Sequence, residues 1–304
     1  MKWFLIVNPA AGGGKCKAIW PKVQQQLNAL KISYEFACTT HAGHAETLAK
    51  EAIAKGHRHL AAVGGDGTGH EVVNGILRNG SLPAKEVVYF QIPIGTGNDW
   101  PKTFGFPTDW KKSLTYLQSK KTTLQDIAEV IYQDQSVTKS RYAYNVVGLC
   151  FDAYIAKKIA EAPKGSSNKF KYLLLVLRCL HQFTAQKCTL RVNGLAITEP
   201  SYLINVGICK YSGGGMQLVP HAKPDDNLLA VTHAKDMNKW DIVANLYRLY
   251  NGTIGRHPKV DLMESTSLTV ESEETIYVEA DGEFLGSTPV QVTLAAEKLR
   301  IVAI

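Results

Sequence analysis

The sequence predicts an α/β domain followed by a β-rich domain, and three observations lead to this prediction. From Met1 to Ser119, apolar runs of strand length alternate with segments of helical periodicity. Near residue 122 the pattern changes to strands that follow one another with turns between them. The 304 residues and 45% hydrophobic content suffice for two buried cores. We therefore expect an N-terminal three-layer α/β domain over residues 1–121 and a C-terminal β-sandwich domain over residues 122–304.

The expected elements of the first domain alternate in the order of a mainly parallel sheet flanked by helices. Strands are predicted at residues 3–7, 34–37, 59–63 and 87–92, and helices at 18–30, 45–54, 71–77 and 110–117.

The second domain is expected to be mostly antiparallel sheet, with three helices interrupting it. The final run, residues 299–304, is predicted to be a strand that docks on either sheet, the first domain's included. Strands are predicted at 127–132, 142–147, 189–192, 202–208, 228–231, 267–270, 275–279 and 290–294, and helices at 151–162, 169–183 and 238–250.

Glycine-rich loops follow three of the strands of the first domain. The carboxyl ends of parallel strands meet at one edge of a sheet, where the following helices direct unpaired N–H groups. Glycine lets such backbone amides approach a phosphate closely. A single loop of this kind is an ordinary turn, but three in register predict a phosphate-binding site. The loops read Asn8, Pro9, Ala10, Ala11, Gly12, Gly13, Gly14; then Gly64, Gly65, Asp66, Gly67, Thr68; then Gly95, Thr96, Gly97, Asn98, Asp99.

Asp66 makes the second loop informative. A carboxylate inside a phosphate-binding loop would repel a nucleotide unless a magnesium ion or water lay between them, so Asp66 indicates Mg²⁺. An Asx turn is the structural alternative. Thr68, Glu71 and Asn74 follow at intervals of three on the expected helix, which puts Glu71 and Asn74 within reach of a nucleotide. Helix capping by Thr68 and solvent exposure of the other two are the alternatives.

Further motifs occur in both halves of the chain. They are Asn8-Pro9 with Gly12-Gly13, Thr39 ahead of Gly43-His44-Ala45, Gly64 to Glu71 with Asn74-Gly75, Pro93 to Asp99, Pro220-His221-Ala222 with Asp225-Asp226, and Asp281-Gly282-Glu283. With this combination the chain resembles the diacylglycerol kinase catalytic family, specifically the bacterial soluble lipid kinases related to NAD kinase and sphingosine kinase. The GGDGT string is shared with NAD kinases, whereas its combination with PIGTGND and DGE is more specific.

The resemblance implies a nucleotide bound between the two domains. Together with the loops, it predicts that ATP contacts Asn8, Pro9, Ala10, Ala11, Gly12, Thr39, Gly64, Gly65, Asp66, Gly67, Thr68, Glu71, Asn74, Gly95, Thr96, Gly97 and Asn98.

Phosphoryl transfer needs a carboxylate that orients or deprotonates the attacking hydroxyl. Asp281 and Glu283 flank Gly282 just after an expected strand, and the resemblance implies that the general base lies here. Which of the two acts is left open, and a hairpin turn is the structural alternative.

The resemblance also implies a second, structural Mg²⁺. The Asp226 side chain and the carbonyls of Lys223 and Leu228 would hold it, although Asn227 stands where the family usually has glycine. Asparagine tolerates the left-handed conformation better than other side chains do, so the site is still expected. An acidic turn is the alternative.

The expected function is therefore transfer of the terminal phosphate of ATP to the hydroxyl of a lipid such as diacylglycerol, with Mg²⁺. Two alternatives stay open: a kinase of a soluble hydroxyl compound, as NAD kinases are, and a nucleotide-binding protein without catalysis. Intact Asp66, Asp281 and Glu283 argue against the second. The sequence does not identify the lipid.

The net charge of +7 favours anionic partners. No apolar run reaches the roughly 20 residues of a membrane span, so we expect a cytoplasmic protein peripherally associated with the inner face of the membrane. A nucleic-acid partner is not expected, and a homodimer is left open. Residues 170–183 are interpreted as core packing rather than as an interfacial helix, and Tyr144, Tyr247 and Tyr250 as core or domain-interface residues.

Overall fold

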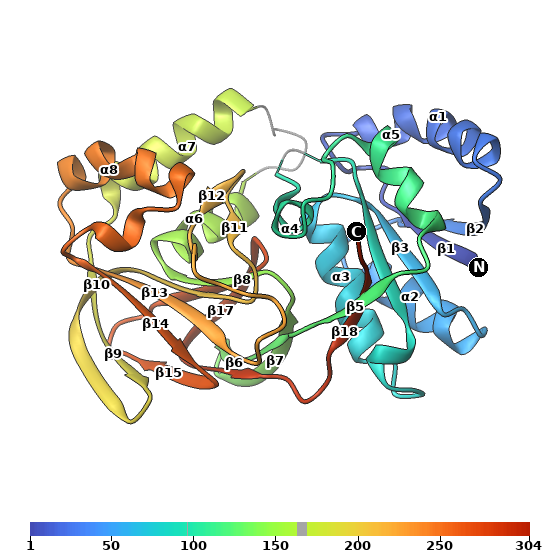
Figure 1. The fold of residues 1–304 in the computed structure, drawn as a ribbon. Helices are drawn as coiled ribbons and strands as arrows, with labels where there is room; N and C mark the ends of the chain where they lie inside the picture. The colour runs from blue at the N-terminus through green and yellow to red at the C-terminus, as the bar shows by residue number, and fades with distance from the viewer. Residues whose placement is uncertain (96, 163–168) are drawn as a thin grey trace. The chain divides into compact units, whose positions relative to one another are not determined.

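The structure is a computed structural model that describes residues 1–95, 97–162 and 169–304 (Figure 1). The chain forms two compact units, the first made of Met1–Ile127 with Ala296–Ile304 and the second of Ala128–Ala295. The predicted organisation, an α/β domain and an antiparallel β domain, is confirmed.

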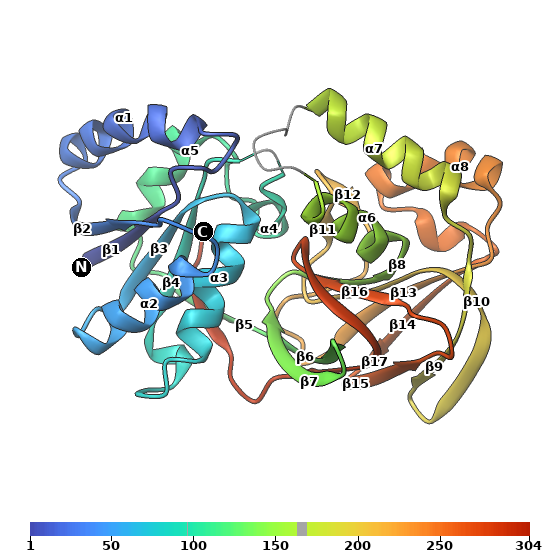
Figure 2. The same cartoon turned by 180° about the vertical axis from the view of Figure 1, so that it is seen from behind.

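The first unit is a three-layer α/β domain. Its sheet has the order β2-β1-β3-β4-β18-β5, in which only β5 runs antiparallel to its neighbour. Helices α1 and α5 cover one face of the sheet, and α2 and α3 cover the other (Figure 1, Figure 2). The strands are β1 (Lys2–Val7), β2 (Ser33–Cys38), β3 (His59–Gly64), β4 (Val88–Pro93), β5 (Thr122–Gln125) and β18 (Leu299–Val302). The helices are α1 (Lys15–Ala29), α2 (His44–Ala54), α3 (Asp66–Leu77), α4 (Asp99–Thr103) and α5 (Trp110–Ser113).

Burial explains these elements. Strands β1, β3 and β4 are buried on both faces over almost their whole length, which is why they are continuous apolar runs in the sequence. Helix α1 buries Cys16, Trp20, Val23 and Leu27, which the 3.6-residue period places on one side of the helix.

The C-terminal strand β18 belongs to the first unit. It lies between β4 and β5, parallel to the former and antiparallel to the latter. The Lys298 ammonium lies 2.7 Å from the buried Asp126 carboxylate, which fastens the returning chain to the end of β5. Because β5 pairs with β18, the first unit extends to Ile127. The sequence had predicted a boundary after residue 121.

The second unit is a ten-stranded antiparallel sheet that curls into a barrel-like shape. Its strands are β6 (Ala128–Asp134), β7 (Val137–Ala143), β8 (Val146–Cys150), β9 (Gln186–Val192), β10 (Leu195–Gly207), β13 (Leu229–Lys235), β14 (Val260–Ser265), β15 (Ser267–Glu271), β16 (Tyr277–Ala280) and β17 (Glu283–Leu294). A closed ring runs β10-β8-β16-β17-β15-β9 and back to β10, because β10 pairs with β9 along its first half and with β8 along its second. A separate two-stranded ribbon joins β11 (Tyr211–Ser212) and β12 (Met216–Gln217).

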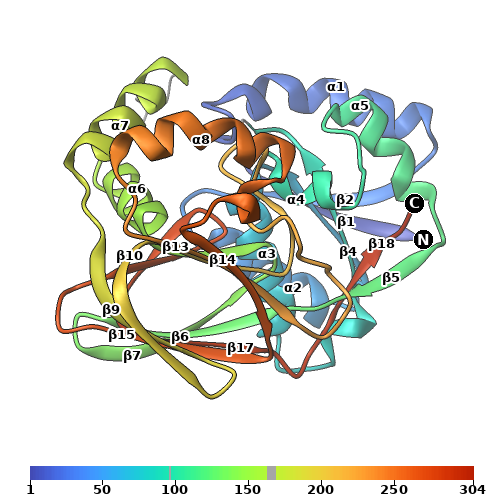
Figure 3. The same cartoon turned by 60° about the vertical axis from the view of Figure 1, so that its left-hand side comes forward.

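Three helices accompany this sheet: α6 (Phe151–Ala160), α7 (Lys169–Gln182) and α8 (Lys239–Asn251). Helices α7 and α8 lie side by side (Figure 1, Figure 3). Their apolar residues differ from the prediction. Tyr144 is fully buried as expected, but Tyr247 and Tyr250 are exposed, and α7 leaves Leu173 and Leu177 exposed while it buries Cys179. Core packing is therefore confirmed only for the side of α7 that carries Cys179, and the interpretation of Tyr247 and Tyr250 as core was wrong. Their alternative role as domain-interface residues stays a prediction.

Candidate functional site

Three loops meet at the carboxyl ends of β1, β3 and β4. The Asn8 N–H donates to the Val63 carbonyl at 3.0 Å, and the Ile94 N–H donates to the Gly64 carbonyl at 2.8 Å. The loops approach so closely that a Cβ added to Gly95 would lie 2.9 Å from the Cα of Gly65. Only glycine permits this contact, so these predicted loops form one close-packed constellation within the first unit.

The first and second loops are also joined by side chains. The Asn8 amide donates from Nδ2 to Thr68 Oγ1 at 2.9 Å, and its Oδ1 accepts the N–H of Ala10 at 3.0 Å. A Cβ on Gly64 would lie 2.5 Å from the same Thr68 hydroxyl. Asn8 and Thr68 therefore fix the shapes of both loops.

The loops have the geometry of an anion site. Gly12, Gly13 and Gly14 have φ of 63°, 68° and 89°, a left-handed run that curls the backbone ahead of α1. Among the described residues, no side chain caps the start of α1 or of α3. Two uncapped helix N-termini beside a glycine curl direct positive partial charge to the same edge, which suits a polyphosphate.

Asp66 lies partly buried at the first residue of α3. Its two carboxylate oxygens each accept the backbone N–H of Asp99 at 3.1 Å, and Oδ1 also accepts Gln91 Nε2 at 3.3 Å. Burial, followed by the negative charge of Asp99, raises the pKa of Asp66 to about 6. The ammonium of Lys102 lies 2.6 Å from Asp99 Oδ1. The lysine thus offsets the charge of Asp99, and Asp66 is held by backbone and amide donors.

The donor set at this point fits a divalent cation. A Cβ on Gly97 would lie 3.1 Å from Asp66 Oδ2 and 3.4 Å from Asp99 Oδ2, so both oxygens border the same glycine. Carboxylate oxygens are the protein ligands that Mg²⁺ prefers, and a cation here would offset the repulsion between the two acids. Asp66 and Asp99 are the residues that would hold it. Asp99 was not among the site residues predicted from the sequence, although it is the last residue of the GTGND motif.

Glu71 and Asn74 have structural contacts of their own. The Glu71 carboxylate accepts the N–H groups of Gly43 at 2.8 Å and Ala45 at 3.0 Å, so it caps α2. Asn74 is fully buried and donates to the carbonyl of His70 within α3. Asn74 is thus held inside the first unit rather than exposed, and its contact with a nucleotide stays a prediction.

The other predicted nucleotide-binding residues lie along the same edge. Thr39 follows β2 and donates its N–H to the Val7 carbonyl at 2.8 Å. Asn98, with φ of 50°, donates from Nδ2 to the Gly95 carbonyl at 3.2 Å. Pro9, Ala10, Ala11 and Gly67 belong to the loops or to the first turn of α3. Thr96 lies outside the described residues.

In the second unit, the Asp281 side chain holds the turn at residues 144–146 against its own turn by hydrogen bonds. Its carboxylate accepts the N–H groups of Asn145 at 2.9 Å, Val146 at 3.1 Å and Tyr144 at 3.2 Å, and its own N–H donates to the Val146 carbonyl at 2.8 Å. These contacts explain why the predicted strand over 142–147 is divided into β7 and β8. Glu283, the other candidate, begins β17 and is exposed.

Two further acids of the second unit, the buried Glu279 and the half-buried Asp152, were not predicted from the sequence. Glu279 accepts the Gly282 N–H at 2.6 Å, and burial, followed by the charge of Asp152, raises its pKa well above the usual range. Asp152 accepts Asn205 Nδ2 at 3.0 Å, and burial raises its pKa to about 6. The available signal was an acid within an otherwise apolar run, as in Phe151 to Ile155.

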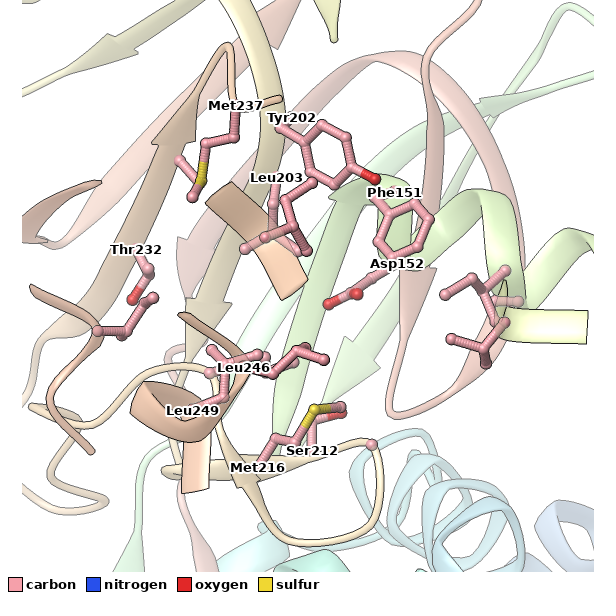
Figure 4. A pocket seen from close by; sticks show the side chains of 18 of the residues that line it. Phe151, Asp152, Tyr202, Leu203, Ser212, Met216, Thr232, Met237, Leu246 and Leu249 are labelled. Atoms are coloured by element: carbon pink, nitrogen blue, oxygen red, sulfur yellow. The ribbon is translucent and has the colours of Figure 1, made fainter. Parts of the chain in front are cut away.

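Both acids border a largely apolar cavity of about 240 Å³ (Figure 4). All of its lining belongs to the second unit, from α6, α7, α8 and the sheet. Phe151, Leu203, Met216 and Leu249 are among the apolar residues around it, and the Asp152 carboxyl points in from one side (Figure 4). The cavity therefore combines apolar walls with carboxyl groups of raised pKa.

The segment predicted to hold a structural Mg²⁺ is a tight turn. Asp226 Oδ1 accepts the N–H of Leu228 at 3.0 Å, and Asn227 has the left-handed φ of 63° that glycine would favour. Asn227 thus adopts the conformation expected of glycine at this position, and metal binding by Asp226 and the carbonyls of Lys223 and Leu228 stays a prediction.

A second acidic group lies on the sheet, where Glu199, His233 and Asp261 approach one another. Lys235 Nζ lies 3.1 Å from the Asp261 carboxylate and 3.7 Å from that of Glu199. The lysine supplies the positive charge there, so we interpret the group as an ion-pair network.

Two family models match the chain and together cover most of it. The diacylglycerol kinase catalytic domain matches residues 2–130, and the YegS C-terminal NAD kinase β-sandwich-like domain matches residues 145–303, more than half of the chain. The chain belongs to the diacylglycerol kinase catalytic-domain family. Membership in this lipid kinase family makes it a phosphotransferase.

Similar proteins cover this kinase from end to end. A protein of Bacillus subtilis is 27% identical over 98% of both chains, and a Staphylococcus carnosus protein named diacylglycerol kinase is 26% identical over 94% of this chain and 89% of its own. A crystal structure of a diacylglycerol kinase from Bacillus anthracis superimposes with a TM-score of 0.69 at 21% identity, covering 100% of this chain and 97% of that one.

A yeast NADH kinase in complex with NADH shares the fold, with a TM-score of 0.55 at 10% identity, covering 100% of this chain and 84% of that one. In the part of this kinase that the structure describes, no helix is long and apolar enough to span a bilayer.

We predict that Asp66→Asn stabilises the protein at neutral pH in the absence of nucleotide and Mg²⁺. Because folding raises the pKa of Asp66 from 3.8 to about 6, the folded state binds its proton more tightly, and stability falls as pH rises through that window. The amide removes this loss, which predicts a gain of about 1–3 kcal/mol at pH 7 and almost none at pH 3.5. Denaturant unfolding against pH measures it.

The exposed Glu51→Gln on α2 is the matched control and should leave the pH profile unchanged. Identical pH profiles for Asp66→Asn and the unmodified protein would contradict the assignment of a destabilising charge to Asp66.

Proposed function

We propose that this kinase transfers the γ-phosphate of ATP to the hydroxyl group of a lipid such as diacylglycerol. The observation that carries the lipid acceptor is the cavity of the second unit, which has apolar walls and carboxyl groups at the half-buried Asp152 and the buried Glu279. An acyl-bearing alcohol matches both properties, since its chains prefer apolar walls and its hydroxyl needs a hydrogen-bond acceptor.

ATP would bind at the three loops of the first unit. The left-handed run Gly12 to Gly14 and the uncapped starts of α1 and α3 support contacts to its phosphates. Asp66 and Asp99 would hold Mg²⁺, which neutralises charge on the phosphates during transfer. Lys102 keeps Asp99 in position by their 2.6 Å ion pair.

Of the two predicted carboxylates, Glu283 is the better candidate for the general base. Asp281 already accepts three backbone N–H groups, so its oxygens are committed to holding the turn, and we assign it as a positioning residue. Glu283 is two residues away, exposed, and fixed at the start of β17. An exposed carboxylate on a rigid strand is free to accept the hydroxyl proton.

A soluble acceptor is the main alternative. The fold that this chain shares with a yeast NADH kinase makes the alternative worth testing, although that likeness concerns the fold alone. A polar dinucleotide would leave apolar walls such as those formed by Leu203 and Leu249 without matching contacts. The composition of the cavity therefore favours the lipid. A membrane lipid as acceptor implies a reaction at a membrane surface, and the net charge of +7 is consistent with attraction to anionic phospholipid.

A panel of acceptors tests the proposal. The purified protein would receive labelled ATP and Mg²⁺ with diacylglycerol, phosphatidylglycerol, ceramide, sphingosine, undecaprenol or NAD. We expect label in one or more lipids and none in NAD, because only the lipids present acyl or prenyl chains to the cavity. Label in NAD alone would support the soluble-substrate alternative, and ATP binding without any transfer would support a protein without catalysis.

We further predict that Glu283→Gln lowers kcat by about 10²-fold to 10⁴-fold, the usual contribution of a general base, with ATP affinity and thermal stability unchanged. Asp281→Asn should lower kcat and also the unfolding temperature. The backbone N–H groups of residues 144–146 lose their charged acceptor, and the amide keeps only one accepting oxygen. Kinase assays and calorimetric melting measure both effects.

Glu273→Gln, an exposed acid ahead of β16, is the matched control for the loss of charge. Full activity of Glu283→Gln would remove this residue from the mechanism.

A further inference from the structure

Helix α8 has apolar side chains on two of its sides, and none of its residues is fully buried. Ile242, Leu246 and Leu249 line the cavity from one side of the helix. The opposite side carries Trp240, which is 83% exposed, and Val243, Tyr247 and Tyr250, which are 48%, 55% and 61% exposed. The positions 240, 243, 247 and 250 repeat at helical spacing, so these side chains share one face.

Helix α7, which lies beside α8, also has exposed apolar side chains. Leu173, Leu174 and Leu177 are each at least half exposed, while Val176 lines the cavity. The two helices are joined where the Lys239 ammonium donates to the His181 carbonyl, and they lie side by side in both views (Figure 1, Figure 3). We name Leu173, Leu174, Leu177, Trp240, Val243, Tyr247 and Tyr250 the α7/α8 apolar surface.

Seven exposed apolar residues on two neighbouring helices indicate an interaction site, since monomeric proteins rarely leave a large apolar patch in water. The same two helices present apolar residues to the cavity on their other side. Leu246, 41% exposed and also part of the cavity wall, lies at the boundary between the two faces of α8. The surface and the proposed acceptor cavity are thus separated only by these helices.

The charges around the surface are positive. The described part of α7, from Leu173 to Gln182, carries Arg178 and no acidic residue. In α8, Lys239 and Arg248 stand against a single acid, Asp241, whose carboxylate pairs with Lys259 at 3.6 Å. Apolar and aromatic side chains bordered by basic groups are typical of helices that lie in the interface of an anionic bilayer.

We propose that the α7/α8 apolar surface docks on an anionic phospholipid bilayer, with Trp240 and the two tyrosines at the level of the headgroups. Tryptophan and tyrosine favour this level because one end of each side chain is apolar and the other forms hydrogen bonds. The inference rests on the proposed function for its purpose, which is to bring a membrane lipid to the cavity behind α8. Docking itself requires neither ATP nor catalysis.

A second copy of the chain is the competing occupant of this surface. A two-fold interface would place the same patch on both subunits, so each basic border would face its like. Lys239, Arg178 and Arg248 would then repel their counterparts, whereas phosphate headgroups would attract them. The charge pattern therefore favours the bilayer.

The test is co-sedimentation of the full chain with vesicles of equimolar phosphatidylglycerol and phosphatidylcholine, without nucleotide. Trp240→Ala combined with Tyr247→Ala should weaken binding about tenfold or more, because both side chains leave water on docking. Both are exposed and neither lines the cavity, so the variant should fold, and it should still phosphorylate a short-chain diacylglycerol dissolved as monomers.

Val137→Ala combined with Leu195→Ala is the matched control, since these residues are 56% and 63% exposed on strands of the same unit away from the two helices. Vesicle binding by this control should equal that of the unmodified protein.

Unchanged vesicle binding by the Trp240/Tyr247 variant would overturn the proposal, as would a failure of the unmodified protein to bind these vesicles. A dimer of the unmodified protein that the variant abolishes, without any effect on vesicles, would assign the surface to a second copy instead. The variant could lose vesicle binding while the unmodified protein phosphorylates only NAD. That result would support the docking surface and contradict the proposed lipid acceptor.

Discussion

The close packing of three glycine-containing loops is the constraint on which the proposed nucleotide site of this kinase depends. Gly95 lies against the Cα of Gly65, and Gly64 lies against Thr68, so no side chain fits at either glycine. This packing fixes where α1, α3 and α4 begin, and it brings Asp66 to the backbone N–H of Asp99. Asp66, whose pKa is raised by burial, is thus held beside Asp99, where the proposed Mg²⁺ would bind.

The second unit places acids inside apolar surroundings by a different route. Asp281 is stabilised by three backbone donors, which fold the chain before β8 into a turn. Glu279 and Asp152 have fewer such partners, and burial raises the pKa of both. Carboxyl groups of this kind are costly to bury, so their position beside the apolar cavity is most simply explained by an acceptor that needs them.

Local patterns predicted most of the fold and the loops, because buried parallel strands are continuous apolar runs and glycine turns are visible at their ends. Long-range contacts were less accessible. The position of β18 depends on pairing with β4 and β5, and the role of Asp281 depends on backbone groups 135 to 137 residues away. The burial of Asn74 was missed because helical spacing gives a face but not what covers it. The exposure of Tyr247 and Tyr250 was missed for the same reason.

The most direct test of the account is calorimetric titration of Mg·ATP into the unmodified protein and into Gly95→Ala, with thermal unfolding of both recorded beside it. A Cβ at residue 95 would lie 2.9 Å from the Gly65 backbone and would force the loops apart. We expect saturable, Mg²⁺-dependent ATP binding by the unmodified protein. Gly95→Ala should remain folded and lose this binding. Equal ATP affinity of the two proteins would contradict the claim that the three packed loops form the nucleotide site.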